Sequence, residues 1–240
     1  MERIDVLGVG FDNLTMDEAV AEGVRLMNSP GAHYVVTPNP EIVEICARDA
    51  EANRAINGAD MVIADGVGII HGAKLLGTPL KAKLPGIEFA SELMGKMAEQ
   101  SKSLFLFGAK PGIAEIAAAN LAKKYPGLKI AGVNDGYFKD DKPIIEKIKN
   151  SGADVVFVCL GAPKQEKWME QNGEATGAHL LLGIGGSLDV FAGVVKRAPE
   201  IYQKLGMEWF YRLLKQPSRI GRMAKLPMFL VHAASKGKTK

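Results

Sequence analysis

A strand, a turn and a helix can be read from the sequence Gly161-Ala162-Pro163-Lys164-Gln165-Glu166-Lys167-Trp168 together with the apolar run 155–160 before it. The run is continuously apolar and rich in β-branched residues, which predicts a buried parallel strand. Gly161 allows a sharp turn, and Pro163 suits the first position of a helix, where its missing N–H costs nothing. This order of elements is the repeating unit of an α/β fold.

The first turn of that helix carries Lys164, Gln165, Glu166 and Lys167. In open α/β sheets, ligands bind where strands end. Lysine does not stabilise a helix N-terminus, because the helix dipole favours anions there. Lysines, an amide and free N–H groups together suit an anionic or polar ligand. The alternative is a solvated helix start with incidental charges.

Apolar runs alternate with helical patterns along most of the chain. Strands are predicted at 3–8, 33–37, 61–64, 103–107, 128–133, 154–160 and 178–183, and helices near 16–28, 40–56, 67–76, 87–100, 111–124, 140–151 and 163–173. Helices of this length between strands imply βαβ units with right-handed crossovers. We therefore expect an α/β fold: a Rossmann-like, mainly parallel sheet with helices on both faces, plus a C-terminal helical appendage.

Composition limits the class of protein. The chain has 240 residues, of which 47% are hydrophobic and 24% charged, as in a globular protein with a full core. No apolar run is long enough to span a membrane, and the first residues do not resemble a signal peptide. Cys46 and Cys159 form no motif, which fits a reducing compartment. We expect a protein of the cytoplasm.

The net charge of +3 hides an asymmetry between two parts of the chain. Residues 196–240 hold eleven lysines and arginines and two acids, a charge of +9, which leaves −6 for residues 1–195. This divides the chain into an α/β domain at 1–195 and a basic appendage at 196–240. The appendage is expected to meet a polyanion, either a membrane surface or a nucleic acid.

Turn chemistry recurs at the ends of the predicted strands. Glycine or proline stands there beside small polar residues, at 37–40, 65–66, 108–112, 134–136, 161–163 and 185–187. Glycine lets a ligand approach the backbone, and helix N-termini at such turns can hold phosphates. Six such turns at one edge of a sheet indicate a large polar substrate.

Several kinds of chemistry find no support. The sequence has neither a dinucleotide fingerprint after its first strand nor a P-loop, and no serine-nucleophile elbow. Its four histidines lack metal-ligand spacing, and no Asp-x-Asp pair is present. We expect neither a metal nor another cofactor. Asp65, at a strand end, is the best candidate for a general base that deprotonates an acceptor hydroxyl. The alternative role for Asp65 is N-cap of the next helix.

The appendage contains an amphipathic pattern. Tyr202, Leu205, Trp209 and Leu213 recur at helical spacing, and Pro217 interrupts the basic stretch that follows. A second apolar piece covers 226–231. Basic residues opposite Trp and Phe suit a helix lying on an anionic bilayer. The alternative is a final helix packed on the domain with a solvated basic side.

These motifs together resemble the WecG/TagA/CpsF family of bacterial glycosyltransferases, and its TagA-like branch in particular. The resemblance runs in order over nearly the whole chain. It is carried by 37–43 (TPNPEIV), 64–68 (ADGVG), 136–138 (GYF), 161–168 (GAPKQEKW), 185–190 (GGSLDV), 196–199 (KRAP), 208–209 and 211–213.

The resemblance implies an inverting, metal-independent transfer of N-acetylmannosamine from its UDP derivative to N-acetylglucosamine on an undecaprenyl diphosphate carrier, which makes the linkage unit of wall teichoic acid. Inversion needs one displacement and one general base. Asp65 matches the base proposed for the family, and Thr37 and Gln165 match residues expected to contact substrate. Lys83 stands where the family often has arginine, which keeps the charge but loses the bidentate fork.

The resemblance also places the partners. The expected substrate-binding residues are Asn39, Gly108, Asn134, Asp135, Gly161, Pro163, Glu166, Gly185 and Gly186, with uracil, ribose and diphosphate of the UDP-sugar over the strand ends. Arg212, Arg219 and Arg222 would face the lipid diphosphate or the active site. The expected partners are then the UDP-sugar, the polyprenyl-diphosphate acceptor and an anionic membrane, with no nucleic acid. The protein would be peripheral on the inner face of the plasma membrane. A homo-oligomer stays an open alternative, and one that hides the tail would be less active.

Three other functions are alternatives to this one. In the first, the donor is UDP-N-acetylmannosaminuronic acid, as in the WecG branch. Its extra carboxylate would require an additional cation near the sugar. A nucleotide-binding regulatory protein with a nucleic-acid-binding tail would bind nucleic acid with a steep salt dependence and transfer no sugar. A nicotinamide oxidoreductase is disfavoured by the missing fingerprint.

Overall fold

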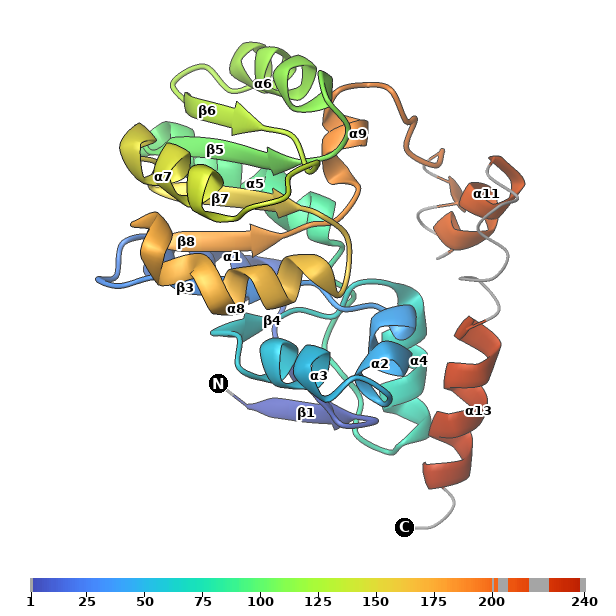
Figure 1. Cartoon of the computed structure of the whole chain (residues 1–240). Helices are drawn as coiled ribbons and strands as arrows, with labels where there is room; N and C mark the ends of the chain where they lie inside the picture. Colours follow the sequence, from blue (N-terminus) through green and yellow to red (C-terminus); the bar gives the residue numbers. More distant parts are fainter. Residues whose placement is uncertain (1, 200, 203–206, 216–224, 238–240) are drawn as a thin grey trace.

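The computed structural model describes residues 2–199, 201–202, 207–215 and 225–237. Its centre is a parallel sheet of six strands in the order β4-β3-β8-β7-β5-β6 (Figure 1). The strands are β3 (His33–Val36), β4 (Met61–Val62), β5 (Ser103–Gly108), β6 (Lys129–Asn134), β7 (Val155–Cys159) and β8 (Leu180–Gly183). The predicted mainly parallel α/β sheet is confirmed.

Helices cover both faces of the sheet, as predicted. One face packs against α1 (Met16–Met27), α5 (Gly86–Glu99), α6 (Ile113–Lys124) and α9 (Ser187–Phe191). The other face packs against α2 (Pro40–Cys46), α3 (Ala50–Asn57), α7 (Lys142–Ser151) and α8 (Lys164–Thr176). Alternate residues of one strand point to opposite faces, so Leu104 and Leu106 enter the first core and Phe105 and Phe107 the second.

The predicted strand at 3–8 is present only at 3–6, and an additional strand follows it. Residues 3–12 form an antiparallel hairpin of β1 (Arg3–Val6) and β2 (Val9–Asp12) beside the main sheet. Its two turn residues, Leu7 and Gly8, both have positive φ, which fits the tight turns that join hairpin strands. Buried Asp12 accepts a hydrogen bond from the Val62 N–H at 2.8 Å and so fastens the hairpin to β4.

The predicted helix at 40–56 is two helices. The first ends at Cys46, and Asp49 then caps α3 by accepting a hydrogen bond from the N–H of Ala52. Aspartate is a strong N-cap residue, so it starts a new helix inside an otherwise continuous helical pattern.

Two helices of the appendage lie in the described part of the chain: α11 (Glu208–Lys215) and α13 (Lys225–Gly237). Helix α13, which includes the apolar piece at 226–231, runs along α4 (Val67–Leu75) and also contacts α2 (Figure 1). Phe229 and Ala233 are fully buried in this contact. Within the described residues, no helix is long and apolar enough to cross a membrane.

Candidate active site at the carboxyl edge of the sheet

The carboxyl ends of the six parallel strands line one edge of the sheet, and most of the predicted site residues lie there. Along the strand order, this edge carries Asp65 after β4, Thr37 after β3, Gly185 and Gly186 after β8, Gly161 and Pro163 after β7, Gly108 at the end of β5, and Asn134 and Asp135 at the end of β6. Residues that are up to 149 positions apart in the chain thus lie along one edge.

The loops that follow the adjacent strands β5 and β7 diverge to opposite faces of the sheet. The connection after β5 leads to α6 on one face of the sheet, whereas the connection after β7 leads to α8 on the other. Gly108 has φ 131, and a Cβ at this position would overlap the backbone of Cys159. Ligands of open α/β sheets bind in the crevice outside such a divergence of loops.

Asp65 is held where β4 ends. Its backbone N–H donates to the Pro38 carbonyl at 3.2 Å, and the carbonyl of Ala64 accepts a hydrogen bond from Leu84 at 2.8 Å. The N-cap position of α4 is occupied by Gly66, with φ 95, so Asp65 lies one residue before the cap position that was its alternative role. The half-buried Lys83 lies next to Leu84, on the segment that runs beside this strand end.

Thr37 joins two neighbouring strand ends. Its side chain is buried, and its Oγ1 donates to the carbonyl of Gly183 at 2.9 Å. A Cβ at Gly86 would lie 3.0 Å from the Thr37 side chain, so the start of α5 also packs closely against Thr37. Asn39, two residues later, caps α2 by accepting from the Ile42 N–H at 3.1 Å.

Gln165 and Glu166 are buried despite their polar side chains, with exposed fractions of 2% and 1%. The Gln165 Nε2 donates to Glu166 Oε1 at 2.9 Å, and the Gln165 Oε1 accepts from the N–H of Gly185 at 3.1 Å. Burial raises the pKa of the Glu166 carboxyl, against a smaller opposing effect of the Gln165 hydrogen bond. Gly186 caps α9, the helix that follows β8.

The two lysines in the first turn of α8 have different surroundings. Lys167 forms ion pairs with Asp49 at 2.9 Å and Glu51 at 3.0 Å, so its charge is engaged by α3. The Lys164 ammonium lies 4.0 Å from the centre of the Phe138 ring, a cation–π contact. Of the two, Lys164 is the lysine that stays near the strand-end loops.

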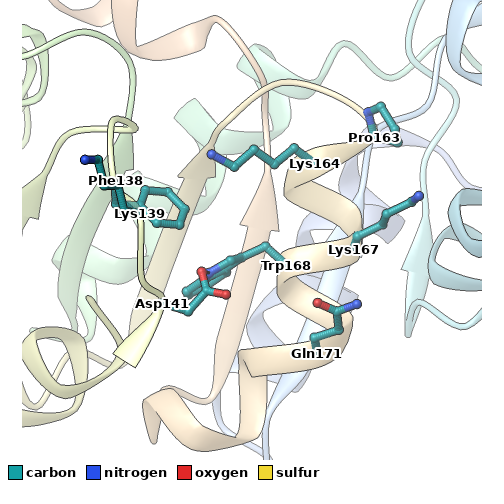
Figure 2. Close-up of a pocket in the computed structure, with 8 residues that line it drawn as sticks. All are labelled: Phe138, Lys139, Asp141, Pro163, Lys164, Lys167, Trp168 and Gln171. Carbon is teal, nitrogen blue, oxygen red and sulfur yellow. Dashed lines mark hydrogen bonds between the residues drawn. The ribbon is translucent and has the colours of Figure 1, made fainter. Parts of the chain in front are cut away.

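A cavity of about 520 Å³ lies beside α8, between its first turns and the loop after β6. Figure 2 shows Lys164 extending toward Phe138 and Lys139, while Lys167 points the other way. The Trp168 Nε1 donates to Asp141 at 2.8 Å, and the Trp168 ring packs edge-on against Phe107. No pattern in the sequence indicates this cavity, although Phe138 and Trp168 belong to the motifs at 136–138 and 161–168.

The polar residues after β6 have defined partners. Asn134 accepts from the Lys147 ammonium at 3.0 Å and donates to the carbonyl of Asp135. Asp135 in turn accepts from the N–H of Tyr137 at 2.8 Å. These bonds order the turn and leave the Tyr137 side chain 69% exposed.

The appendage is tied to the α/β part by charged contacts. Arg197 forms ion pairs with Glu88 of α5 and, at 3.3 Å, with Glu208 of α11. His232 of α13 lies 2.8 Å from the buried Glu44. Arg212 lies on α11, but its side chain is outside the described part of the structure, as are Arg219 and Arg222 altogether.

Comparison with known proteins agrees with this architecture. The model of the glycosyl transferase WecG/TagA/CpsF family matches residues 4–240. N-acetylglucosaminyldiphosphoundecaprenol N-acetyl-beta-D-mannosaminyltransferase of Staphylococcus aureus strain MW2 is 37% identical over 236 residues, which cover 97% of this chain and 92% of the relative. The enzyme of the same name from strain MRSA252 is 36% identical over the same length. Because the match extends over both the sheet and the appendage, the chain belongs to the WecG/TagA/CpsF family of glycosyl transferases.

Proposed function

We propose that this protein transfers N-acetylmannosamine from UDP-N-acetylmannosamine to N-acetylglucosamine on undecaprenyl diphosphate. The names of the relatives include both this acceptor and this sugar. They favour N-acetylmannosamine over its uronic acid as the donor sugar. They also favour an enzyme over a regulatory protein that binds nucleic acid.

The observation that carries the proposal is the arrangement of the sheet edge. A crevice outside β5 and β7 is the preferred place for the nucleotide in such a sheet. Asp65 follows β4, three strand spacings from β7. At about 4.8 Å for each spacing, this is about 14 Å, which an extended nucleoside diphosphate sugar can span. The uridine would lie near Gly108 and Gly161, and the sugar would extend toward Asp65.

In the proposed reaction, the Asp65 carboxylate accepts the proton of an acceptor hydroxyl as its oxygen attacks the anomeric carbon. The bond between that carbon and the diphosphate oxygen breaks, and UDP leaves. A single displacement inverts the configuration. Lys164, Lys83 and the N–H groups at the starts of α6 and α8 are suited to the diphosphate charge.

We further propose that the acceptor's lipid carrier determines where the protein works. Substrate on a lipid requires the site to open toward a bilayer, and the basic appendage is suited to an anionic surface. The protein would then be peripheral on the inner face of the plasma membrane. A homo-oligomer at the membrane is a separate prediction.

The test is transfer by the full-length chain with a synthetic polyprenyl-diphosphate N-acetylglucosamine acceptor. UDP-N-acetylmannosamine and its uronic acid analogue are compared, each with and without EDTA. We expect a β-linked disaccharide from the first donor only, at an unchanged rate in EDTA. Transfer from the uronic acid alone would contradict the donor, loss of activity in EDTA would contradict the metal-independent mechanism, and no transfer from either would contradict the proposal as a whole.

A further inference from the structure

Glu166 follows Gln165 directly in the sequence, in the first turn of α8. Both are buried, and the Glu166 Oε1 accepts the hydrogen bond of the Gln165 Nε2 at 2.9 Å. We infer that Glu166 is a positioning residue, which fixes the side-chain amide of Gln165 for the transfer reaction instead of contacting the substrate itself. The inference deepens the proposed function and rests on it.

The hydrogen bonds define which way the Gln165 amide points. The Gly185 N–H donates to its oxygen, and Glu166 accepts from its nitrogen. Rotating this amide by 180° would set its nitrogen against the Gly185 N–H and its oxygen against the Glu166 oxygen, so both hydrogen bonds would be lost. With a donor on one side and an acceptor on the other, only one orientation satisfies both.

The fixed amide lies against the end of β8. A Cβ at Gly183 would lie 3.1 Å from the Gln165 Nε2, which is tighter than most Cβ contacts, so glycine leaves room for this close approach. The carbonyl of the same glycine accepts the Thr37 hydroxyl at 2.9 Å. Gln165 and Thr37, which come from different strand ends, therefore hold the β8 turn between them. Through Gln165, Glu166 supports a turn at the centre of the candidate site.

The environment of Glu166 suits a neutral acid. Its side chain is 1% exposed, and its Oε2 has no hydrogen-bond partner among the described residues. Burial raises the pKa of its carboxyl, which favours the protonated form. A protonated carboxyl keeps one oxygen that can only accept, and this suits the Gln165 N–H. A glutamine at this position would offer the same acceptor oxygen without a charge.

The test is a double-mutant cycle in the full-length protein, with transfer from UDP-N-acetylmannosamine as the assay. Glu166→Leu removes both oxygens, and Gln165→Ala removes the amide. We expect each to lower kcat by about 10- to 100-fold with little change in the KM for the donor, because a misplaced group costs rate more than binding. If Glu166 acts through Gln165, the double variant loses no more than Gln165→Ala alone. Glu166→Gln should restore the wild-type kcat.

Thr176→Val is the matched control. Thr176 is a buried polar residue of the same helix, and its Oγ1 donates to the carbonyl of Gly173 at 2.6 Å. This variant should lower the melting temperature without the kcat loss. Losses in the double variant that multiply, a fully active Glu166→Leu, or an inactive Glu166→Gln would each overturn the inference.

A second measurement does not depend on the substrate. In ¹H–¹⁵N spectra of the full-length protein, the Gln165 side-chain amide is identified by its disappearance in Gln165→Ala. Its signals should keep their positions in Glu166→Gln and Thr176→Val, and should move or broaden in Glu166→Leu. Unchanged signals in Glu166→Leu would overturn the inference. If the wild type transferred no sugar, the proposed function would fail, and these spectra would still decide the role of Glu166.

Discussion

At the scale of single residues, Asp65 is the side chain on which the proposed chemistry depends. Asp65→Asn removes the base and keeps the shape, so we expect kcat to fall by about 10²- to 10⁴-fold with an unchanged melting temperature. Its matched control is Asp60→Asn at the opposite end of the same strand. Asp60 accepts from the Tyr34 N–H at 2.9 Å and lies 2.8 Å from the His33 ring nitrogen.

Asp60→Asn should cost about 1 kcal/mol of stability and leave kcat as it is, because its partners are structural. Steady-state transfer rates and thermal unfolding of both variants test the pair. Wild-type turnover in Asp65→Asn would remove Asp65 as the base. An equal loss of turnover in both variants would show that the strand as a whole, and not its carboxylate, limits the rate.

Glu166 gives the unfolding free energy a definite pH dependence. Burial raises the pKa of its carboxyl above the ordinary value of 4.5, so the folded state holds this proton more tightly than the unfolded state. The stabilisation is present below pH 4.5 and is lost as the pH rises through the folded pKa. Glu166→Gln cannot lose it.

The stability of Glu166→Gln relative to wild type should therefore rise with pH above 4.5, by up to about 1.4 kcal/mol per pH unit. Urea unfolding of both proteins at several pH values between 4.5 and 8 measures this difference. Groups such as Asp154, whose pKa is lowered, titrate in both proteins and cancel. A difference that does not vary with pH would show that Glu166 is charged in the folded protein.

The strand-end residues could be predicted from the sequence, but their surroundings could not. Asp65, Thr37 and Gly161 follow apolar runs directly, and parallel strands bring such positions to one edge. By contrast, Gln165 and Glu166 lie in a sequence of polar residues that reads as a solvated helix start. Their burial depends on tertiary structure, because α8 packs against β3 and β8 and the Gln165 amide lies at the end of β8.

At the scale of elements, hydrophobic periodicity located most helices and strands, and local turn chemistry caused the errors. Leu7 and Gly8 reverse the chain within what reads as one apolar strand, and Asp49 starts a helix within what reads as one helical pattern. Both signals are one or two residues long. They are outweighed when a pattern is averaged over a longer window.

Helix α13 is seated on α4 through glycine. A Cβ at Gly72 would lie 2.6 Å from the Phe229 ring, which is fully buried. Gly72→Val should therefore displace α13, although valine has a better helix propensity than glycine. Gly95→Ala is the matched control, since a Cβ at Gly95 in α5 meets nothing within 4 Å. This control should gain about 0.5–1 kcal/mol of stability.

Hydrogen exchange measured by mass spectrometry separates the two glycine variants. In Gly72→Val, amides of 225–237 should exchange faster than in wild type, while those of β5 and β7 keep their protection. In Gly95→Ala, no segment should exchange faster. Wild-type protection of 225–237 in Gly72→Val would mean that Phe229 and α13 shift without undocking.

At the scale of the whole molecule, the candidate site and the excess of positive charge lie in different parts of the chain. The sheet edge has glycine turns and a carboxylate for a sugar nucleotide, while the appendage carries the excess of positive charge. Arg197 connects the two parts, because it pairs with Glu88 next to the site and with Glu208 at the start of α11. Under the proposed function, in which the acceptor is carried by a lipid, Arg197 would connect the proposed membrane surface to the site.

The charge of the appendage leads to a prediction about the proposed membrane binding. Changing Arg212, Arg219 and Arg222 together to Glu should weaken binding of the full-length protein to phosphatidylglycerol-rich vesicles by at least about 100-fold. Each arginine near an anionic surface contributes about 1 kcal/mol, and three contribute about 3 kcal/mol.

The control changes the exposed Lys123, Lys124 and Lys129 to Glu. It alters the net charge equally, but outside the appendage, so it should bind nearly as wild type does. Sedimentation with vesicles at two salt concentrations measures both, since higher salt should weaken only the binding that depends on charge. Equal weakening in the two variants would assign membrane binding to the net charge of the molecule, and no weakening in either would leave the bilayer contact to the apolar side chains of the appendage.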